Sequence, residues 1–199
     1  MSKMKKLMVI LGMLFLGTVS SQSTAQVWIG PSANFGHAFF VPYNSDIEFQ
    51  PHYSVGLTTL VNINDNWGLV GSALYSSEGR LMDDGRNKTD IRLDYIRIPI
   101  RGIFYFAGMD QTVRPKISAG PSLGILVNED GTNVGKKAES ADFGVNATGG
   151  VDIKLNEEVL LTAEVNYYQG FIKNRPNYEK KEYNGNIGFN LGVLFVIPE

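Results

Sequence analysis

The stretch that decides the fold is Val113 to Asn128, VRPKISAGPSLGILVN, because its side chains change chemical class at every step. The odd positions are all apolar: Val113, Pro115, Ile117, Ala119, Pro121, Leu123, Ile125 and Val127. The even positions are mostly polar or small: Arg114, Lys116, Ser118, Gly120, Ser122, Gly124, Leu126 and Asn128. Successive side chains of a β-strand point to opposite faces, so this period of two predicts a strand with one apolar and one polar face.

The same alternation recurs on both sides of this stretch, whereas no window after Gln26 has apolar residues at helical spacing. Seven further segments show this alternation, at residues 27–36, 53–63, 67–78, 91–106, 142–155, 159–168 and 186–197. In the segment 91–106 the phase slips near Tyr95, and we expect a β-bulge there because one extra residue exchanges the two faces. The mature chain therefore predicts eight strands.

The connections between these strands alternate between long and short. They are residues 38–51, 64–66, 79–90, 107–112, 129–141, 156–158 and 172–183. Antiparallel neighbours place successive connections at opposite ends, so the four long ones share one end and the three short ones share the other with both termini. This layout is typical of outer-membrane barrels. We predict an all-β fold, an eight-stranded antiparallel up-and-down transmembrane barrel that occupies residues 26–199.

The first twenty-five residues have the pattern of a secretory signal peptide. Lys3, Lys5 and Lys6 precede an apolar run from Leu7 to Leu16, and small residues lead up to Ala25. A helix needs about 20 apolar residues to span a bilayer, so this run is too short for an anchor. We predict that residues 1–25 are removed by cleavage between Ala25 and Gln26.

The overall composition excludes several classes of function. The formal net charge of −2 becomes more negative once the three lysines of the leader are removed, which argues against nucleic acid as a partner. There is no cysteine, so disulfides and cysteine-based metal or nucleophile chemistry are excluded. The sequence has only two histidines, His37 and His52, which argues against a multi-histidine metal site. We expect neither a metal nor a cofactor.

The chemistry of the polar face distinguishes a membrane barrel from a soluble, lipocalin-like carrier, which would turn its apolar face inward. A water-facing exterior carries charge at about a quarter to a third of its positions, but this polar face is mainly Gly, Ser, Thr and Asn. We therefore predict a polar lumen and a lipid-facing apolar wall. Aromatic residues at strand ends predict two interfacial girdles: Trp28, Trp67, Phe104, Tyr105 and Phe106 at the short-turn end, and Tyr53, Tyr75 and Phe171 at the other.

Alternation places charged side chains inside the barrel. The cations are Arg97, Arg101, Arg114, Lys116 and Lys154, and the counter-charges are Asp152 and Glu164, with Glu78 and Asp94 as further candidates. Eight strands leave an interior just wide enough for side chains to fill. We therefore predict a structural plug of ion pairs rather than a conducting pore, and no catalytic residues.

The triplet His52-Tyr53-Ser54 raises one enzymatic alternative. His and Ser two residues apart share a face of a strand, and outer-membrane lipid A deacylases have a similar His-x-Ser motif. Here Val55 stands where that family has Asn, and the predicted parity turns both polar side chains inward, away from lipid. A polar pair at the barrel rim is the favoured interpretation, and a lipid A hydrolase remains the alternative.

The chain resembles the PorT-like outer-membrane β-barrel domain of Gram-negative bacteria from about Val27 to Ile197. The resemblance is carried by Tyr95-Ile96-Arg97-Ile98-Pro99, by Ala119-Gly120-Pro121, and by Tyr167 with Gly170. It implies an accessory role in protein secretion or envelope assembly. The last strand, Asn190 to Ile197, resembles the signal read by the barrel-assembly machinery, which would be a partner during biogenesis.

The long connections are the expected place for other partners, because loops vary while the scaffold holds them. The first contains Phe39, Phe40, Tyr43 and Phe49, and the fourth is basic, with Lys173, Arg175, Lys180 and Lys181. Lipid, lipopolysaccharide phosphates and a protein are the candidate partners. The main prediction is a non-enzymatic outer-membrane barrel with a structural or surface-interaction role.

Overall fold

The computed structural model describes residues 26–41, 47–48, 50–83, 88–130, 139–173 and 183–198. The predicted signal peptide, the loop aromatics Tyr43 and Phe49, and the basic residues Arg175, Lys180 and Lys181 lie outside these ranges. The side chains of Phe40 and Lys173 lie outside the described part as well.

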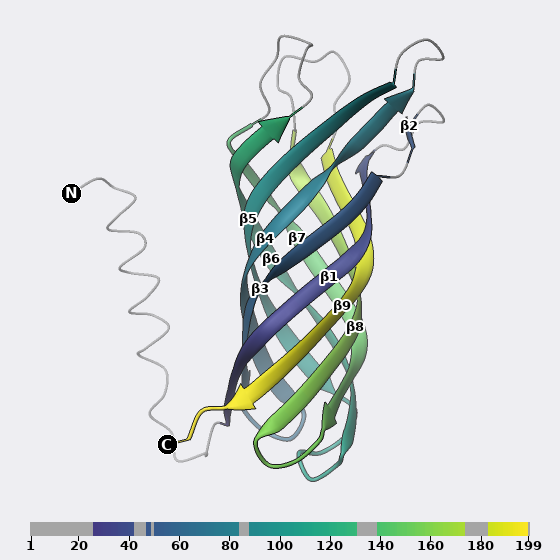
Figure 1. The fold of residues 1–199 in the computed structure, drawn as a ribbon. Helices are drawn as coiled ribbons and strands as arrows, with labels where there is room; N and C mark the ends of the chain where they lie inside the picture. Colours follow the sequence, from purple (N-terminus) through teal and green to yellow (C-terminus); the bar gives the residue numbers. More distant parts are fainter. Residues whose placement is uncertain are drawn as a thin grey trace, which may run out of the picture.

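Within these ranges, nine strands form one closed antiparallel sheet (Figure 1). The eight long strands are β1 (Val27–Val41), β3 (Gln50–Asn62), β4 (Trp67–Asp83), β5 (Lys88–Tyr105), β6 (Val113–Asp130), β7 (Ala141–Lys154), β8 (Val159–Lys173) and β9 (Tyr183–Val196). The pairings of β1 with β9 and of β4 with β5 close the barrel. The short β2 (Ile47–Glu48) pairs with Met82 and Leu81 of β4, where it continues the line of β3. The predicted eight-stranded barrel is confirmed, with β2 as an addition.

One end of the barrel carries the short turns together with the start of β1 and the end of β9 (Figure 1). Asparagine side chains close two of these turns. The Asn64 Oδ1 atom accepts hydrogen bonds from the backbone N–H groups of Asn66 (3.0 Å) and Trp67 (2.9 Å). Asn156 Oδ1 does the same for Glu158 (2.8 Å) and Val159 (2.7 Å). Such side-chain mimicry of a backbone turn explains how so few residues reverse the chain.

At the opposite end, the hairpin end, the strands are longer than predicted. Residues 79–90 were expected to form a loop, but β4 continues to Asp83, which pairs with Lys88 at the start of β5. The other long connections are shortened too, since β1 runs to Val41 and β6 to Asp130. Alternation of polarity stops where a strand leaves the apolar medium, whereas the backbone ladder needs no such pattern. The alternation of polarity in the sequence therefore predicts where the apolar wall ends, but it does not predict where the strands end.

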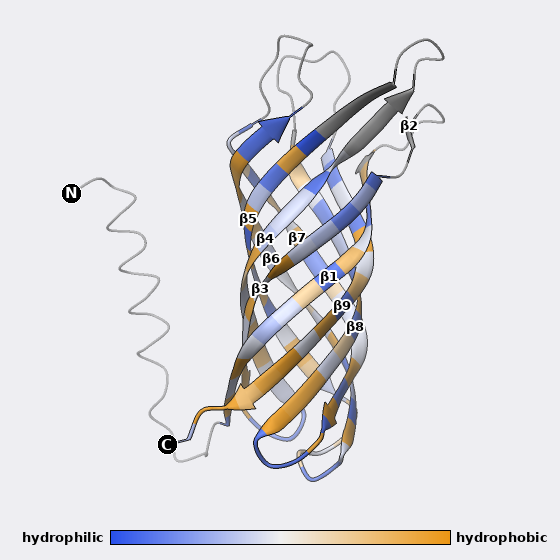
Figure 2. Cartoon of the chain, in the orientation of Figure 1, coloured by the Kyte–Doolittle hydropathy of each residue, from blue (hydrophilic) through white to orange (hydrophobic). Residues whose placement is uncertain are grey.

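The outer wall is apolar and the lumen is polar. Ile117, Val145, Val165 and Leu191 are 51%, 40%, 46% and 57% exposed, whereas Arg114 and Glu164 are only 5% and 4% exposed. Figure 2 shows hydrophobic residues along the barrel wall and hydrophilic ones at the short turns and at the hairpin end of β6. A soluble carrier would have the opposite arrangement, so this alternative is wrong. A continuous exposed apolar surface of this kind is suited to lipid.

The aromatic girdles are present with two exceptions. At the short-turn end the rings of Trp67 and Phe104 (5.1 Å between centroids) and of Phe104 and Phe106 (5.2 Å) meet edge to face. Trp28 and Tyr105 were also assigned to this girdle, but they are 2% and 0% exposed and point into the lumen. Their position at a strand end had suggested an interfacial role. However, both residues alternate in phase with the polar face of their strands, so their side chains point into the lumen.

The predicted bulge is present but on the neighbouring strand. Between Asp94 and Tyr95 the partner in β6 moves from Asn128 to Leu126, so the extra residue is Val127. Strand β5 keeps its phase, because Leu93, Tyr95 and Arg97 are all buried. Asp94 is also buried and accepts a hydrogen bond from Asn128 Nδ2 (3.1 Å) at this point. Three consecutive residues, Leu93 to Tyr95, are buried, so the alternation in the sequence is interrupted here although the strand keeps its phase.

Candidate functional site

The lumen is the candidate site, and strand β5 contributes side chains to it along its whole length. From the short-turn end, its inward side chains are Tyr105, Ile103, Arg101, Pro99, Arg97 and Tyr95. Consecutive inward residues of a strand lie about 6.6 Å apart along it, because each residue advances the chain by about 3.3 Å. Along this strand the lumen is first filled by apolar side chains and then by charged ones. A cavity follows, and beyond it lies a second level of charged side chains.

The first level is an apolar cluster, here called the apolar seal. It consists of Trp28, Leu60, Val70, Ile103, Tyr105, Leu160 and Leu194, all buried, and it draws on β1, β3, β4, β5, β8 and β9. Sequence reasoning missed this cluster. The available signal was the placement of Leu160 and Leu194 at polar-face positions close to the short-turn end. Apolar residues that break the polar phase at the same end of several strands meet inside a barrel.

The second level, the lower network, joins Arg101, Lys116, Asp152 and Glu164. The Lys116 ammonium lies 2.6 Å from Asp152 Oδ1 and 2.8 Å from Glu164 Oε1. Arg101 Nη1 is 3.2 Å from Glu164 Oε2. The Tyr105 hydroxyl donates to Asp152 Oδ2 (2.7 Å) and so connects the network to the apolar seal. These buried charges balance one another, which offsets the cost of removing them from water.

Two predicted lumen cations lie apart from this network. Arg114 is buried near the short turns, where its Nη2 donates to the carbonyl of Asp65 (2.9 Å) and its guanidinium stands 3.6 Å from the centre of the Tyr105 ring. No carboxylate pairs with it among the described residues. Lys154 reaches the turn instead, 2.7 Å from Glu157.

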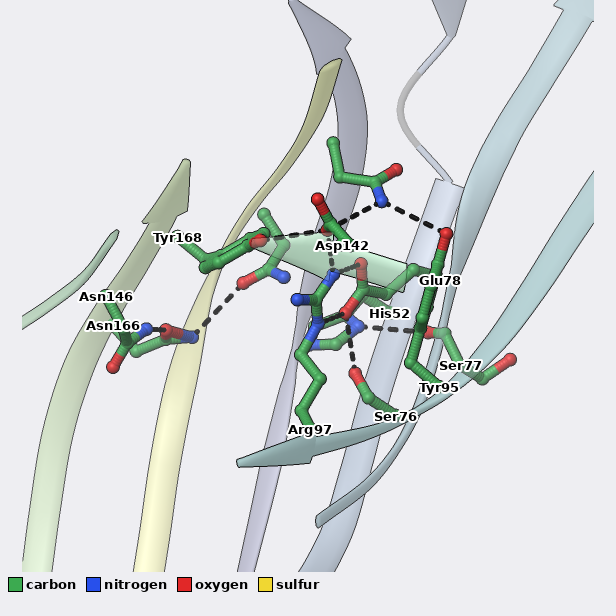
Figure 3. Close-up of polar contacts among 12 residues, drawn as sticks. His52, Ser76, Ser77, Glu78, Tyr95, Arg97, Asp142, Asn146, Asn166 and Tyr168 are labelled. Atoms are coloured by element: carbon green, nitrogen blue, oxygen red, sulfur yellow. Dashed lines mark hydrogen bonds and ion pairs between the residues drawn. The ribbon is translucent and has the colours of Figure 1, made fainter. Parts of the chain in front are cut away.

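The upper network, near the hairpin end, is built around Arg97 (Figure 3). Its Nη2 donates to Glu78 Oε2 (2.6 Å) and to Asp142 Oδ2 (2.8 Å), and its Nε also pairs with Glu78. The guanidinium lies over the ring of Tyr168, 4.0 Å from its centroid, and 4.9 Å from that of Tyr95. Because Glu78 belongs to β4 and Asp142 to β7, Arg97 bridges the lumen.

Asp142 is the residue of this network that sequence reasoning missed. Besides Arg97, its Oδ2 atom accepts from the Tyr168 hydroxyl (2.8 Å) and from Asn184 Nδ2 (2.9 Å). Asn184 also donates to the Tyr95 hydroxyl (3.3 Å). The signal that could have found it was its place on the polar face of residues 142–155, the same face that carries Asp152.

A polar cavity of about 50 Å³, here called the chamber, lies between the two networks. Its wall is mainly hydroxyl and amide side chains, with charged residues of the two networks and with Leu74, Pro99 and Tyr168. The polar and charged members are Ser32, Asn34, His52, Ser54, Ser72, Ser76, Ser122, Asn146, Asn166, Asn186, Asn190, Arg97, Arg101 and Glu164. Several of these groups bond to one another, as Asn146 Nδ2 does to Asn166 Oδ1 (2.8 Å; Figure 3).

His52 and Ser54 lie in the wall of this chamber and not at the barrel rim. His52 Nδ1 donates to the carbonyl oxygen of Ser77 (2.9 Å), beside Glu78 (Figure 3). Both side chains are buried inside the barrel, on the face away from the lipid. An attack on a membrane lipid needs these groups on the outer face, so the geometry does not fit the lipid A hydrolase alternative.

A closed antiparallel barrel with an apolar wall, a polar interior and short turns at one end is the architecture of outer-membrane β-barrels. Residues 20–175 match the family described as outer membrane protein beta-barrel domain, and the chain belongs to this family. It is therefore a protein of the outer membrane, in an environment of lipid and lipopolysaccharide. In such barrels the short turns are periplasmic, so the hairpin end is extracellular.

Solved structures show the same fold at low sequence identity. OprG from Pseudomonas aeruginosa is 16% identical, with a TM-score of 0.60 over 88% of this chain and 97% of that one. Neisserial surface protein A is 18% identical, with a TM-score of 0.56 over 84% and 96% of the two chains. Escherichia coli outer membrane protein W is 14% identical, with a TM-score of 0.52 over 89% and 100%. No curated protein matches the sequence.

Proposed function

We propose that this protein is a non-enzymatic outer-membrane barrel with a closed lumen, which acts as a structural element and presents its extracellular hairpins to partners. The observation that carries this proposal is the filling of the lumen. The apolar seal, the lower network and the upper network lie one above another, and their residues are at most 5% exposed. A barrel closed in this way has no open channel through which it could serve as a general pore.

Electrical recording tests the closed lumen directly. The purified protein is inserted into a planar lipid bilayer, with a general porin as the positive control. We expect no steady current, and a heat-dependent shift in gel migration shows that the inserted protein is folded. A stable ohmic current from folded protein would contradict the proposal.

We further propose that the protein is exported by a signal peptide at residues 1–25 and is inserted by the barrel-assembly machinery. The composition of this segment supports the first step, and the outward-facing side chains of β9, Phe189, Leu191, Val193 and Phe195, support the second. Mass determination of the protein isolated from outer membranes tests the cleavage after Ala25. A mature chain that still carries the leader would contradict it.

The resemblance to PorT-like barrels supports a second candidate, an accessory role in protein secretion or envelope assembly. Two of the segments that carry that resemblance lie on the neighbouring strands β5 and β6, where Pro99 pairs with Ser122 and Ala119 with Gly102. Between these pairs the strands approach closely, since a Cβ on Gly120 would lie 2.0 Å from the carbonyl oxygen of Ile100. Co-purification of the protein with a secretion complex from mild detergent extracts would favour this candidate over a purely structural role.

A further inference from the structure

Three polar groups on the chamber wall have no hydrogen-bond partner within the described chain. They are Arg97 Nη1, Arg101 Nε and Asn34 Oδ1, all buried. Arg97 and Arg101 approach the chamber from its two ends, and Asn34 lies on its side. Buried polar groups in proteins are almost always hydrogen-bonded to protein or to ordered water. An empty chamber would leave two guanidinium nitrogens and one amide oxygen unsatisfied.

The size and chemistry of the chamber fit bound water. A water molecule needs at least about 10–15 Å³ of such space and two to four polar partners. The chamber offers about 50 Å³, so it has room for a small cluster. Its charges favour water over a bound anion. The Arg97 guanidinium already faces the two carboxylates of Glu78 and Asp142, and Arg101 faces Glu164.

We propose that the chamber is a binding site for a cluster of water molecules, enclosed between two barriers of different chemistry, and that it forms the middle of a latent path for small ions. This inference rests on the closed lumen of the proposed function and says what closes it. The extracellular barrier is the upper network, in which Arg97 is held across the lumen by Glu78 and Asp142. The periplasmic barrier is the lower network and, beneath it, the apolar seal.

The two barriers exclude ions for different reasons. The upper network blocks the lumen with side chains that are fixed by charge-assisted hydrogen bonds. The apolar seal offers an ion almost nothing to replace its hydration shell, and small apolar gaps stay dry. Because the barriers lie in series, either one alone stops an ion. Removal of one barrier therefore opens the chamber to one side of the membrane, and only removal of both opens a path.

Thiol labelling tests the enclosure. The chain has no cysteine, so Ser54→Cys places a single thiol in the chamber wall. In detergent micelles both mouths of the barrel are in contact with solvent. We expect a small charged thiol reagent to leave this thiol unlabelled in the otherwise unchanged protein. Labelling should be gained when Arg97, Glu78 and Asp142 are all replaced by serine. It should also be gained when Trp28 and Ile103 of the seal are replaced by serine together with the charge-balanced lower network, Arg101, Lys116, Asp152 and Glu164. Glu157→Cys, in an exposed turn, is the control that is labelled in every background.

Conductance across a planar bilayer tests the series arrangement with the same two sets of substitutions. We expect each set alone to give no current and the combination to give a small current. The upper set removes a cation together with both of its carboxylate partners, so it leaves no unpaired charge in that layer. If the periplasmic set does not show the heat-dependent gel shift of a folded barrel, Leu60→Ser and Val70→Ser take the place of Trp28→Ser and Ile103→Ser in it.

The outcomes separate this inference from the proposed function. Current in the unchanged protein would overturn both. A closed unchanged protein whose Ser54→Cys thiol is already labelled would overturn only the enclosed chamber, because water would then exchange freely with one side. Current from either set alone, or no current from the folded combination, would overturn the series arrangement.

Discussion

The two charged levels of the lumen differ in how their charges are matched. In the lower network two cations, Arg101 and Lys116, face two carboxylates, Asp152 and Glu164. In the upper network Arg97 alone serves both Glu78 and Asp142. A balanced set retains some pairing when one member is lost, whereas a set with one cation does not. The comparison teaches that the two levels should differ in their sensitivity to single substitutions.

The largest effect is expected from Arg97→Met. The substitution leaves Glu78 and Asp142 buried with no cation between them, and breaking a buried pair costs about 3–5 kcal/mol. With two carboxylates affected, we expect the free energy of unfolding to fall by about 5 kcal/mol, the upper end of that range. Urea unfolding in detergent micelles, followed by gel migration, measures it.

The control for Arg97→Met is the same substitution combined with Glu78→Gln and Asp142→Asn. This neutral set removes the unpaired charges and should recover most of the lost stability, since neutral groups of similar volume often replace a buried ion pair without loss. If the single and the triple variant are equally unstable, the cost comes from packing and the comparison fails.

Glu164→Ala should have the second largest effect. Its loss removes the described carboxylate partner of Arg101 but leaves Lys116 paired with Asp152. We therefore expect a loss of about 3 kcal/mol, the lower end of the range for a broken buried pair. Glu158→Ala, in an exposed periplasmic turn, is the matched control and should leave the urea midpoint unchanged. An effect of Glu164→Ala as large as that of Arg97→Met would show that charge balance does not protect the lower network.

Much of this barrel could be predicted from the period of two in the sequence. Alternation within Val113 to Asn128 places Arg114 and Lys116 on one face and Ile117 on the other, and one residue of slip would reverse them. The lipid-facing wall, the strand number and the end that carries the turns all follow from such local patterns. Local patterns were least informative where the lipid ends, as at Asp83 and Lys88, which pair beyond the alternating segment.

The partners inside the lumen could not be predicted, because they depend on how the sheet closes. Arg97 and Asp142 are 45 residues apart, and only the tilt and stagger of a closed barrel bring them to the same height. Trp28 was misplaced for a related reason. A tryptophan at a strand end suits the membrane interface as well as the bottom of a lumen, and only the apolar neighbours from β3, β4, β5, β8 and β9 distinguish the two.

The apolar seal gives a third test, in which no charge is involved. Ile103 is 0% exposed and lies at the level below Arg101, so Ile103→Ala leaves a cavity among the seal residues. Truncation of a buried isoleucine to alanine costs about 2–5 kcal/mol, and in a narrow barrel we expect about 2 kcal/mol. Ile117→Ala shortens a side chain on the lipid-facing wall by the same amount and should cost less, because lipid fills the space. Equal losses would show that the seal is not closely packed.

The smallest effect is expected from Arg114→Ala, although Arg114 and Arg97 share many features. Both are arginines that point inward, both are 5% exposed, and both lie over a tyrosine ring. The difference is in their partners, since Arg114 donates to the backbone carbonyl of Asp65 (2.9 Å) and more weakly to that of Ala107 (3.4 Å) and to the Oδ1 atom of Asn62 (3.4 Å). The two backbone carbonyls belong to periplasmic turns where water can replace the lost donor, and the bond to the Asn62 side chain is long, so we expect a loss of only about 1 kcal/mol, the net value of an ordinary hydrogen bond. Measured beside Arg97→Met under the same conditions, this variant separates the value of a buried arginine from the value of the carboxylates it holds. If both substitutions cost the same, burial and ring stacking stabilise the lumen, and the ion pairs of the upper network are not its main support.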